Sequence, residues 1–348
     1  MKIYNWEGEA LKMHDVFLPD EQQRSAGMMA WLRSLPGPVW MTMKGKDDSR
    51  HRIVVTLLHG NEPSGLRAIW ELFSCPPACA VTTHFCIANV DAALEQPEFS
   101  FRHLDDKPDL NRCFGRPGNC LSYHLARDIE ERIQALTPEA VVDLHNTSGS
   151  SPSFAVSLSD DSEHKAIASL FTERFLHTSV HLGALMELSS PELPIVTIEC
   201  GGVNDNTSDI TALDGLQRFL TKVNIRRARP KVNLDVLHNP VRVKLVPGST
   251  ICYHSRQVGG VDLIMAKDVD KHNFGLLKAG TQIGWLGEAK LNCLSVTNGG
   301  QQCSVSDYFK CQKGKLVLKK DSQLFMITTN PKIAIEDCLF YLVPDKSE

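Results

Sequence analysis

Short apolar runs rich in β-branched residues alternate with amphipathic stretches over about residues 52–223, and this alternation constrains the fold more than any other feature. Apolar runs of about four to eight residues between turn signals indicate buried strands, and apolar residues three or four positions apart indicate helices. The alternation therefore predicts an α/β layer fold. We expect strands at 53–58, 80–89, 140–144, 154–158 and 195–199, two helices with Ser64 and Ser122 as their N-caps, and helices around 167–171 and 213–223.

The pattern changes after a basic, proline-broken segment at 226–231. Residues 241–246 and 281–286 alternate apolar and polar side chains, with glycine and proline turns between them, which is typical of half-exposed strands. A chain of 348 residues has the usual length for two domains. We predict an α/β domain at 1–228 and a smaller, mostly β domain at 229–348.

Charge and hydropathy exclude two classes of partner. The chain has 37 Lys and Arg against 41 Asp and Glu, a net charge of −4, so no global positive field is present to attract nucleic acid. The basic segment at 226–231 is interpreted as a solvated linker. The longest apolar runs fall far short of the roughly 20 residues that span a bilayer. We therefore expect neither a nucleic-acid partner nor a membrane.

Cysteine usage favours a reducing compartment. The 11 cysteines are an odd number at irregular spacing, which argues against a disulfide framework. The acidic residues near the start also argue against a secretory signal. We expect a cytoplasmic protein with reduced thiols. A structural zinc site at Cys75, Cys79 and Cys86, with His84 as a fourth ligand, is a less favoured alternative to buried thiols.

Ionisable side chains follow two of the predicted strands where each strand ends. His59 and Glu62 lie in the turn after the strand at 53–58, and His145 follows the strand at 140–144. Ligands collect at the carboxyl ends of parallel strands, so the three side chains are expected to converge. Two histidines and a glutamate form a ligand set for catalytic zinc, with a fourth position open. The alternative is a surface His59–Glu62 ion pair and an ordinary core histidine. Asp143 is expected to orient an imidazole or to bind backbone.

A further acid and a polar loop complete the predicted site. Glu199 ends the apolar strand at 195–199, which makes it a candidate general base; an ion-paired or capping glutamate is the alternative. The long segment 90–121 contains Asn111 and Arg112, whose amide and guanidinium can bind a substrate carboxylate. Arg102 is a candidate for stabilising the charge that develops on a carbonyl oxygen. Taken singly, each arginine is more often a solvated surface group.

Except for Arg102, these residues lie in four motifs that together resemble the aspartoacylase and succinylglutamate desuccinylase family, which is itself similar to zinc carboxypeptidases. The motifs are HGNE at 59–62, DLNR at 109–112, DLHNT at 143–147 and TIECGG at 197–202. The resemblance implies one Zn²⁺ per chain held by His59, Glu62 and His145, with Glu199 as general base. It also implies that Asn111 and Arg112 hold the substrate carboxylate. Arg102 resembles the family's carbonyl-polarising arginine but lies two residues further from DLNR.

The resemblance implies a zinc-carboxypeptidase-like mixed sheet flanked by helices and a C-terminal β domain that narrows access. The function expected is a zinc-dependent amidohydrolase that releases an acetyl- or succinyl-type group from a small N-acyl amino acid. A zinc carboxypeptidase acting on short peptides and a noncatalytic metal-pocket binding protein are the alternatives. A homo-oligomer is left open, and no residue of the second domain is assigned to the site.

Overall fold

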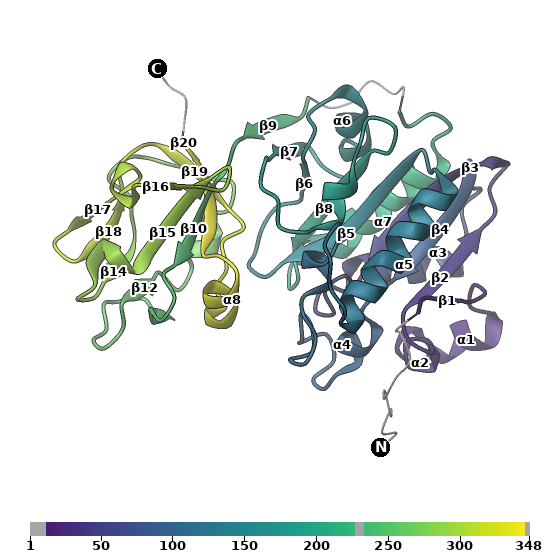
Figure 1. Cartoon of the computed structure of the whole chain (residues 1–348), viewed down its shortest axis with the longest axis horizontal. Coiled ribbons are helices and arrows are strands. Elements are labelled where there is room, and N and C mark those ends of the chain that lie inside the picture. Colours follow the sequence, from purple (N-terminus) through teal and green to yellow (C-terminus); the bar gives the residue numbers. More distant parts are fainter. Residues whose placement is uncertain (1–11, 227–232, 345–348) are drawn as a thin grey trace.

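The computed structural model describes residues 12–226 and 233–344, which form a large mixed sheet with helices and two smaller C-terminal sheets (Figure 1). The central strands β4, β3, β5 and β8 are parallel, whereas β6 runs antiparallel to β8. Across the sheet the order is β1 (His14–Asp15), β2 (Val39–Met43), β4 (Val81–Ile87), β3 (Asp47–Thr56), β5 (Ala140–Thr147), β8 (Ile195–Gly202), β6 (Phe154–Ser157), β7 (Arg174–His177) and β9 (Asp235–His238).

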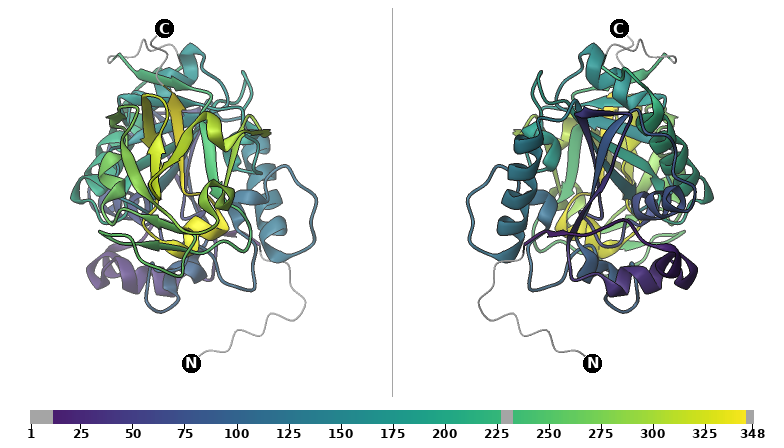
Figure 2. Two further views of the ribbon diagram at one scale, coloured as in Figure 1. Left: turned by 90° about the vertical axis from the view of Figure 1, so that its left-hand side faces the viewer. Right: turned by 90° about the vertical axis from the view of Figure 1, so that its right-hand side faces the viewer.

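Helices cover both faces of this sheet, as Figure 2 shows. They are α1 (Glu21–Ala26), α2 (Met28–Ser34), α3 (Ser64–Ser74), α4 (Val90–Leu94), α5 (Leu121–Leu136), α6 (Ser162–Ala168) and α7 (Asn206–Thr221), with α8 (Pro331–Glu336) in the C-terminal part. Side chains alternate between the faces along a strand, so Val54 of β3 packs in a first core with α3 and α7. Ile53 and Val55 pack on the opposite face in a second core with α5.

The C-terminal part consists of two β-sheets that enclose a third core. The six-stranded sheet has the order β13 (Leu276–Leu277), β19 (Ser322–Phe325), β20 (Phe340–Pro344), β10 (Val241–Leu245), β15 (Leu294–Asn298) and β16 (Gln301–Cys303). The five-stranded sheet has the order β11 (Ile251–Tyr253), β12 (Leu263–Met265), β14 (Gln282–Leu286), β18 (Lys315–Leu318) and β17 (Phe309–Gln312). Phe325 and Tyr341 belong instead to the second core, where Phe325 packs against Phe154.

The predicted fold class is confirmed, because a mixed sheet flanked by helices is followed by a smaller C-terminal β part. The five expected strands correspond to β3, β4, β5, β6 and β8. The expected helix caps are wrong. The Ser64 hydroxyl donates to Asp209, and the Ser64 amide is bound by the Asn146 side chain, 3.1 Å away, so a distant residue satisfies the first amide of α3. The Ser122 hydroxyl donates to the Pro108 carbonyl instead of capping α5.

The predicted domain boundary at 228/229 lies outside the described residues, as does most of the basic segment at 226–231. β9, which follows that segment, pairs with β7 of the large sheet, and the C-terminal sheets begin with β10. Arg226 forms an ion pair with Glu163 at 2.5 Å.

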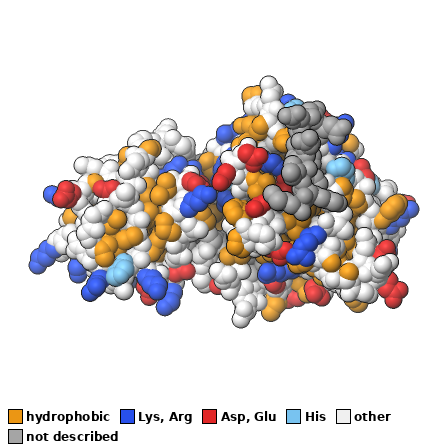
Figure 3. All heavy atoms as spheres, turned by 90° about the horizontal axis from the view of Figure 1, so that it is seen from below, with side chains coloured by type: hydrophobic (Ala, Val, Ile, Leu, Met, Phe, Trp, Pro, Cys, Tyr) orange, Lys and Arg blue, Asp and Glu red, His pale blue; other side chains and the backbone are white. Residues whose placement is uncertain are grey.

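Two features of the described residues bear on the expected compartment and partners. The 11 cysteines are free thiols, and the cytoplasmic location stays a prediction. None of the described helices combines the length and the apolar character that crossing a bilayer requires. Acidic and basic side chains are interspersed on the face shown in Figure 3.

Candidate active site

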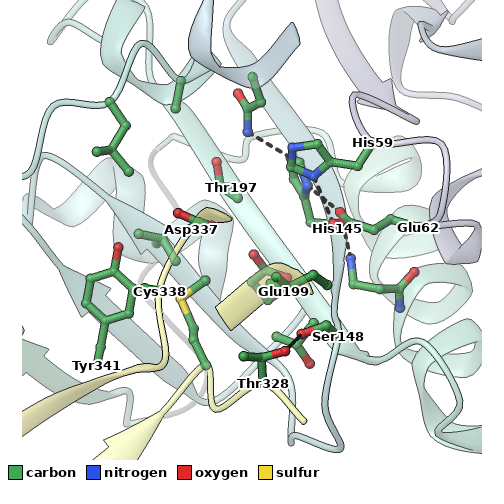
Figure 4. Close-up of a pocket in the computed structure, with 18 of the residues that line it drawn as sticks. His59, Glu62, His145, Ser148, Thr197, Glu199, Thr328, Asp337, Cys338 and Tyr341 are labelled. Carbon is green, nitrogen blue, oxygen red and sulfur yellow. Dashed lines mark hydrogen bonds and ion pairs between the residues drawn. The ribbon is translucent and has the colours of Figure 1, made fainter. Parts of the chain in front are cut away.

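His59, Glu62 and His145 converge at the carboxyl ends of β3 and β5. His59 Nδ1 lies 2.8 Å from Glu62 Oε1, and His145 Nδ1 lies 2.6 Å from Glu62 Oε2 (Figure 4). One ligand atom from each of the three residues lies within 4.8 Å of the others. Their exposed fractions are only 4%, 6% and 3%, so His59 and Glu62 are not a surface ion pair. The structure thus brings together the three predicted metal ligands.

Two aspartates bind the far side of the imidazole rings. His59 Nε2 lies 3.1 Å from Asp109 Oδ1, and His145 Nε2 lies 2.7 Å from Asp143 Oδ2. Metal-binding histidines usually donate their second ring N–H to such a carboxylate, which leaves the other nitrogen unprotonated for the ion. The residues present therefore fit a divalent metal with nitrogen and oxygen ligands. Asp143 orients an imidazole as expected, whereas the role of Asp109 was not predicted.

The charges in this cluster are strongly coupled. Burial alone would raise the pKa of Glu62, but the adjacent His59 and His145 rings hold it well below its usual value. Burial would likewise lower the pKa of His145, but Asp143 and Glu62 raise it well above its usual value. Without a metal, Asp143 and Glu62 thus favour positive charge on the His145 imidazole, and a divalent cation would satisfy the same acids.

Only one other group within the described ranges 12–226 and 233–344 has suitable ligand atoms this close. It consists of Asp160, His177 and His238, of which Asp160 is exposed and the histidines are half-buried. Neither group includes Cys75, Cys79 or Cys86, so the alternative structural zinc site is not formed by the described residues.

Gly60 allows the His59–Glu62 turn to approach α4. A Cβ atom at Gly60 would lie 2.6 Å from the backbone carbon of Ala92. The backbone N–H of Gly60 also donates to the carbonyl of Arg102 at 2.9 Å. Close approach to a neighbouring backbone, and not a left-handed conformation, therefore requires glycine at this position.

Glu199 lies on β8 directly opposite His145 of β5. Its side chain is 8% exposed, and its Oε2 atom has no hydrogen-bond partner among the described residues. Burial raises the pKa of Glu199 to about 7, against the opposing effect of the positive charge on His145. A buried carboxylate with a free oxygen and a pKa near neutrality suits a group that accepts and returns a proton.

The two predicted substrate-facing arginines lie at the cavity, and each is already paired with an acid. Arg102 Nε donates to Asp109 Oδ2 at 2.9 Å, and Arg102 Nη1 lies 3.6 Å from Glu62 Oε1. Arg112 Nη2 lies 3.3 Å from Asp337 Oδ2. Asp337 follows α8, so this acid comes from the C-terminal part.

Asn111 is held by the surrounding protein. Its Oδ1 atom accepts a hydrogen bond from the backbone N–H of Leu185 at 2.9 Å, and its Nδ2 atom lies 3.5 Å from His145 Nε2. Asn111 thus lies beside His145, and its carbonyl oxygen is already used by the protein.

The metal ligands, Glu199, Asn111 and the two arginines line one cavity together with apolar side chains. A concave site with a few polar groups among apolar ones is typical of small-ligand sites. Asp337, Cys338 and Tyr341 close one side of it from the C-terminal part (Figure 4). Sequence reasoning missed all three residues, because they lie in no recognisable motif.

Comparison with known proteins supports the fold. The succinylglutamate desuccinylase/aspartoacylase of Rhodobacter sphaeroides is similar at 15% identity and a TM-score of 0.56, covering 87% of this chain and 88% of that one. The product-bound ectoine utilization protein EutE (DoeB) of Ruegeria pomeroyi is similar at 18% identity and a TM-score of 0.54, covering 86% of each chain. The succinylglutamate desuccinylase of Vibrio parahaemolyticus is similar at 14% identity and a TM-score of 0.56, covering 91% and 94%.

No family model and no curated protein sequence matches the chain. The resemblance predicted from the four motifs is confirmed at the level of the fold by the similarity to these solved structures.

Proposed function

We propose, on the premise that the chain has the fold of succinylglutamate desuccinylase/aspartoacylase proteins, that it is a zinc-dependent amidohydrolase acting on small N-acyl amino acids. The observation that carries the proposal is the buried group His59, Glu62 and His145 beside the unpartnered oxygen of Glu199. A binding protein needs no proton-transferring acid at this position, whereas amide hydrolysis does.

One zinc ion per chain would be held by His59, Glu62 and His145, where it would polarise the amide carbonyl and make water more acidic. Glu199 takes a proton from the attacking water and returns it to the departing amine nitrogen. Arg102, next to Glu62, is placed to stabilise the negative charge that develops on the carbonyl oxygen.

Arg112 orients the substrate. Its guanidinium lies at the cavity and would bind the substrate carboxylate there through its planar N–H donors. Asn111 lies beside His145 and holds the cavity wall by accepting a hydrogen bond from the Leu185 amide. We assign it a positioning role in addition to the amide contact with substrate that the motif implies.

The proposal is tested with the purified full chain, assayed for release of free amine from N-acyl amino acids and from short peptides, with and without added zinc. We expect zinc-dependent hydrolysis of the acyl amino acids. His145→Ala should lose bound zinc and activity together, whereas His14→Ala, at an exposed strand residue, should lose neither. Full zinc occupancy of the His145 variant would contradict the ligand assignment, and preferential cleavage of peptides would indicate a carboxypeptidase.

A further inference from the structure

The cavity has a polar end and an apolar end. The polar end contains the metal ligands, Glu199 and the two arginines. The apolar end, here called the apolar arm, is formed by Val156, Leu176, Val180, Leu182, Ala184 and Met186. Uncharged side chains of this kind gain from covering an apolar group of a ligand and offer no partner to a charged one.

Strand pairing lays the floor of the apolar arm next to Glu199. Thr197 of β8 is paired with Val156 of β6, which is paired with Leu176 of β7. Val156 and Leu176 lie in the second core, on the sheet face that also carries Glu199. Neighbouring strands are about 4.8 Å apart, so the floor extends about 10 Å from Thr197, two residues before the general base, to β7. A floor of this length can cover the whole of a leucine or phenylalanine side chain.

The other wall of the apolar arm begins beside Arg112. It is the segment 178–186, whose Gly183 carbonyl accepts a hydrogen bond from the Phe114 amide at 3.0 Å, close to the DLNR motif. The amide of Leu185 is bound by Asn111. An amino acid whose carboxylate meets Arg112 would therefore place its own side chain along this wall.

The charges at the cavity leave little capacity for a second acid. Among the described residues that line it, Arg102 and Arg112 are the only arginine or lysine side chains. Arg102 is paired with Asp109. Asp337 lies 3.3 Å from Arg112 and 4.0 Å from Arg102, and it also pairs with Arg242 of β10. A second substrate carboxylate would meet the charge of Asp337 or the apolar arm.

We infer that the substrate is an N-acyl amino acid with a single carboxylate and an apolar side chain, and that Asp337 is a specificity residue that disfavours doubly acidic substrates. The inference rests on the proposed function and adds the substrate class. Covering a leucine-sized group raises affinity about ten- to a hundredfold, whereas burying a carboxylate without a partner lowers affinity. Both effects favour an apolar substrate side chain over an acidic one.

The test compares N-acetyl-L-leucine with N-acetyl-L-aspartate, which share the acyl group and differ in the side chain. With the zinc-loaded full chain we expect kcat/KM for the leucine compound to exceed that for the aspartate compound by about a hundredfold. Calorimetric titration of both compounds into the Glu199→Gln variant, which should bind without turnover, should give the same order of affinity.

Two variants examine the residues that carry the inference. Asp337→Asn should lower the leucine-to-aspartate selectivity about tenfold, because one like charge is removed near the arginines. Asp105→Asn, at an exposed aspartate outside the cavity lining, is the charge-matched control and should not change the selectivity. Leu182→Ser in the apolar arm should weaken binding of the leucine compound about tenfold.

The outcomes separate the two proposals. Equal or better hydrolysis of the aspartate compound would overturn the inferred substrate class and leave the amidohydrolase intact. Absence of zinc-dependent hydrolysis of every N-acyl amino acid would overturn the proposed function. If the Glu199→Gln variant in that case still bound the leucine compound more tightly than the aspartate compound, the apolar arm would remain assigned as a binding site for an apolar side chain. An unchanged selectivity in Asp337→Asn would remove Asp337 from the argument.

Discussion

Replacing Glu199 with glutamine should stabilise the metal-free protein while abolishing turnover. Burial raises the pKa of Glu199 from its usual 4.5 to about 7. Between these two values the unfolded chain is ionised and the folded protein holds the proton, so the free energy of unfolding falls as pH rises. A difference of about 2.5 pH units, at about 1.36 kcal/mol per unit, gives about 3 kcal/mol above pH 7. Glutamine does not ionise, so the variant avoids this loss.

The assay is urea unfolding of chelator-treated protein from about pH 4.5 to pH 8.5. The stability gain of Glu199→Gln over the parent should be near zero at the acid end and approach about 3 kcal/mol at the alkaline end. Glu131→Gln, at an exposed glutamate of α5, is the matched control and should show no such growth with pH. A stability difference that stays constant across the pH range would refute the assigned burial and pKa of Glu199.

The same variant tests the proposed chemistry. After zinc is restored, loss of the proton-transferring group should lower kcat at least about a hundredfold, with zinc still bound. Near-normal hydrolysis would remove Glu199 from the role of general base. The Glu199→Gln variant should thus gain stability while it loses activity, as expected for a general base. Replacing a residue that is needed only for folding would lower activity and stability together.

Two further substitutions probe the support of the site, and a third probes the stability of the fold. Asp109→Asn should weaken zinc binding about ten- to a hundredfold in a chelator competition, because His59 loses its carboxylate partner; unchanged affinity would contradict this role. Gly60→Ala should lower zinc occupancy and turnover, since the new Cβ would lie 2.6 Å from the backbone of α4; a fully loaded, active variant would show that the turn can shift freely. Glu139→Ala should reduce the free energy of unfolding in urea by about 3 kcal/mol, because the fully buried Arg52 loses its carboxylate, and a loss below about 1 kcal/mol would disagree with that account.

The sequence was informative where the signal is local. Apolar runs mark β3, β5 and β8 because these strands are buried, and such runs are easily seen against polar turns. His59, His145 and Glu199 follow from the ends of those strands, since adjacent parallel strands bring their ends together. The same reasoning suggested that Asp143 could orient an imidazole.

The remainder depends on contacts between distant segments. Asp337 follows a six-residue helix and reaches Arg112 only because the C-terminal sheets pack against the large sheet. Asn146 caps α3 from another strand, so the local serine at position 64 gave a wrong cap. The pairing of β9 with β7 joins a strand beyond the linker to the large sheet, and no local pattern encodes that pairing.

Phe325 and Tyr341 enter the second core from the C-terminal part, where Phe325 meets Phe154 of β6. The second core is therefore shared between the two halves of the molecule. If the chain were cut between the halves, each fragment would expose aromatic surface that the other normally covers, and such fragments tend to aggregate. The two halves should consequently unfold in a single calorimetric transition. New substrate preferences will be easier to obtain by altering residues of the cavity wall than by exchanging the C-terminal half.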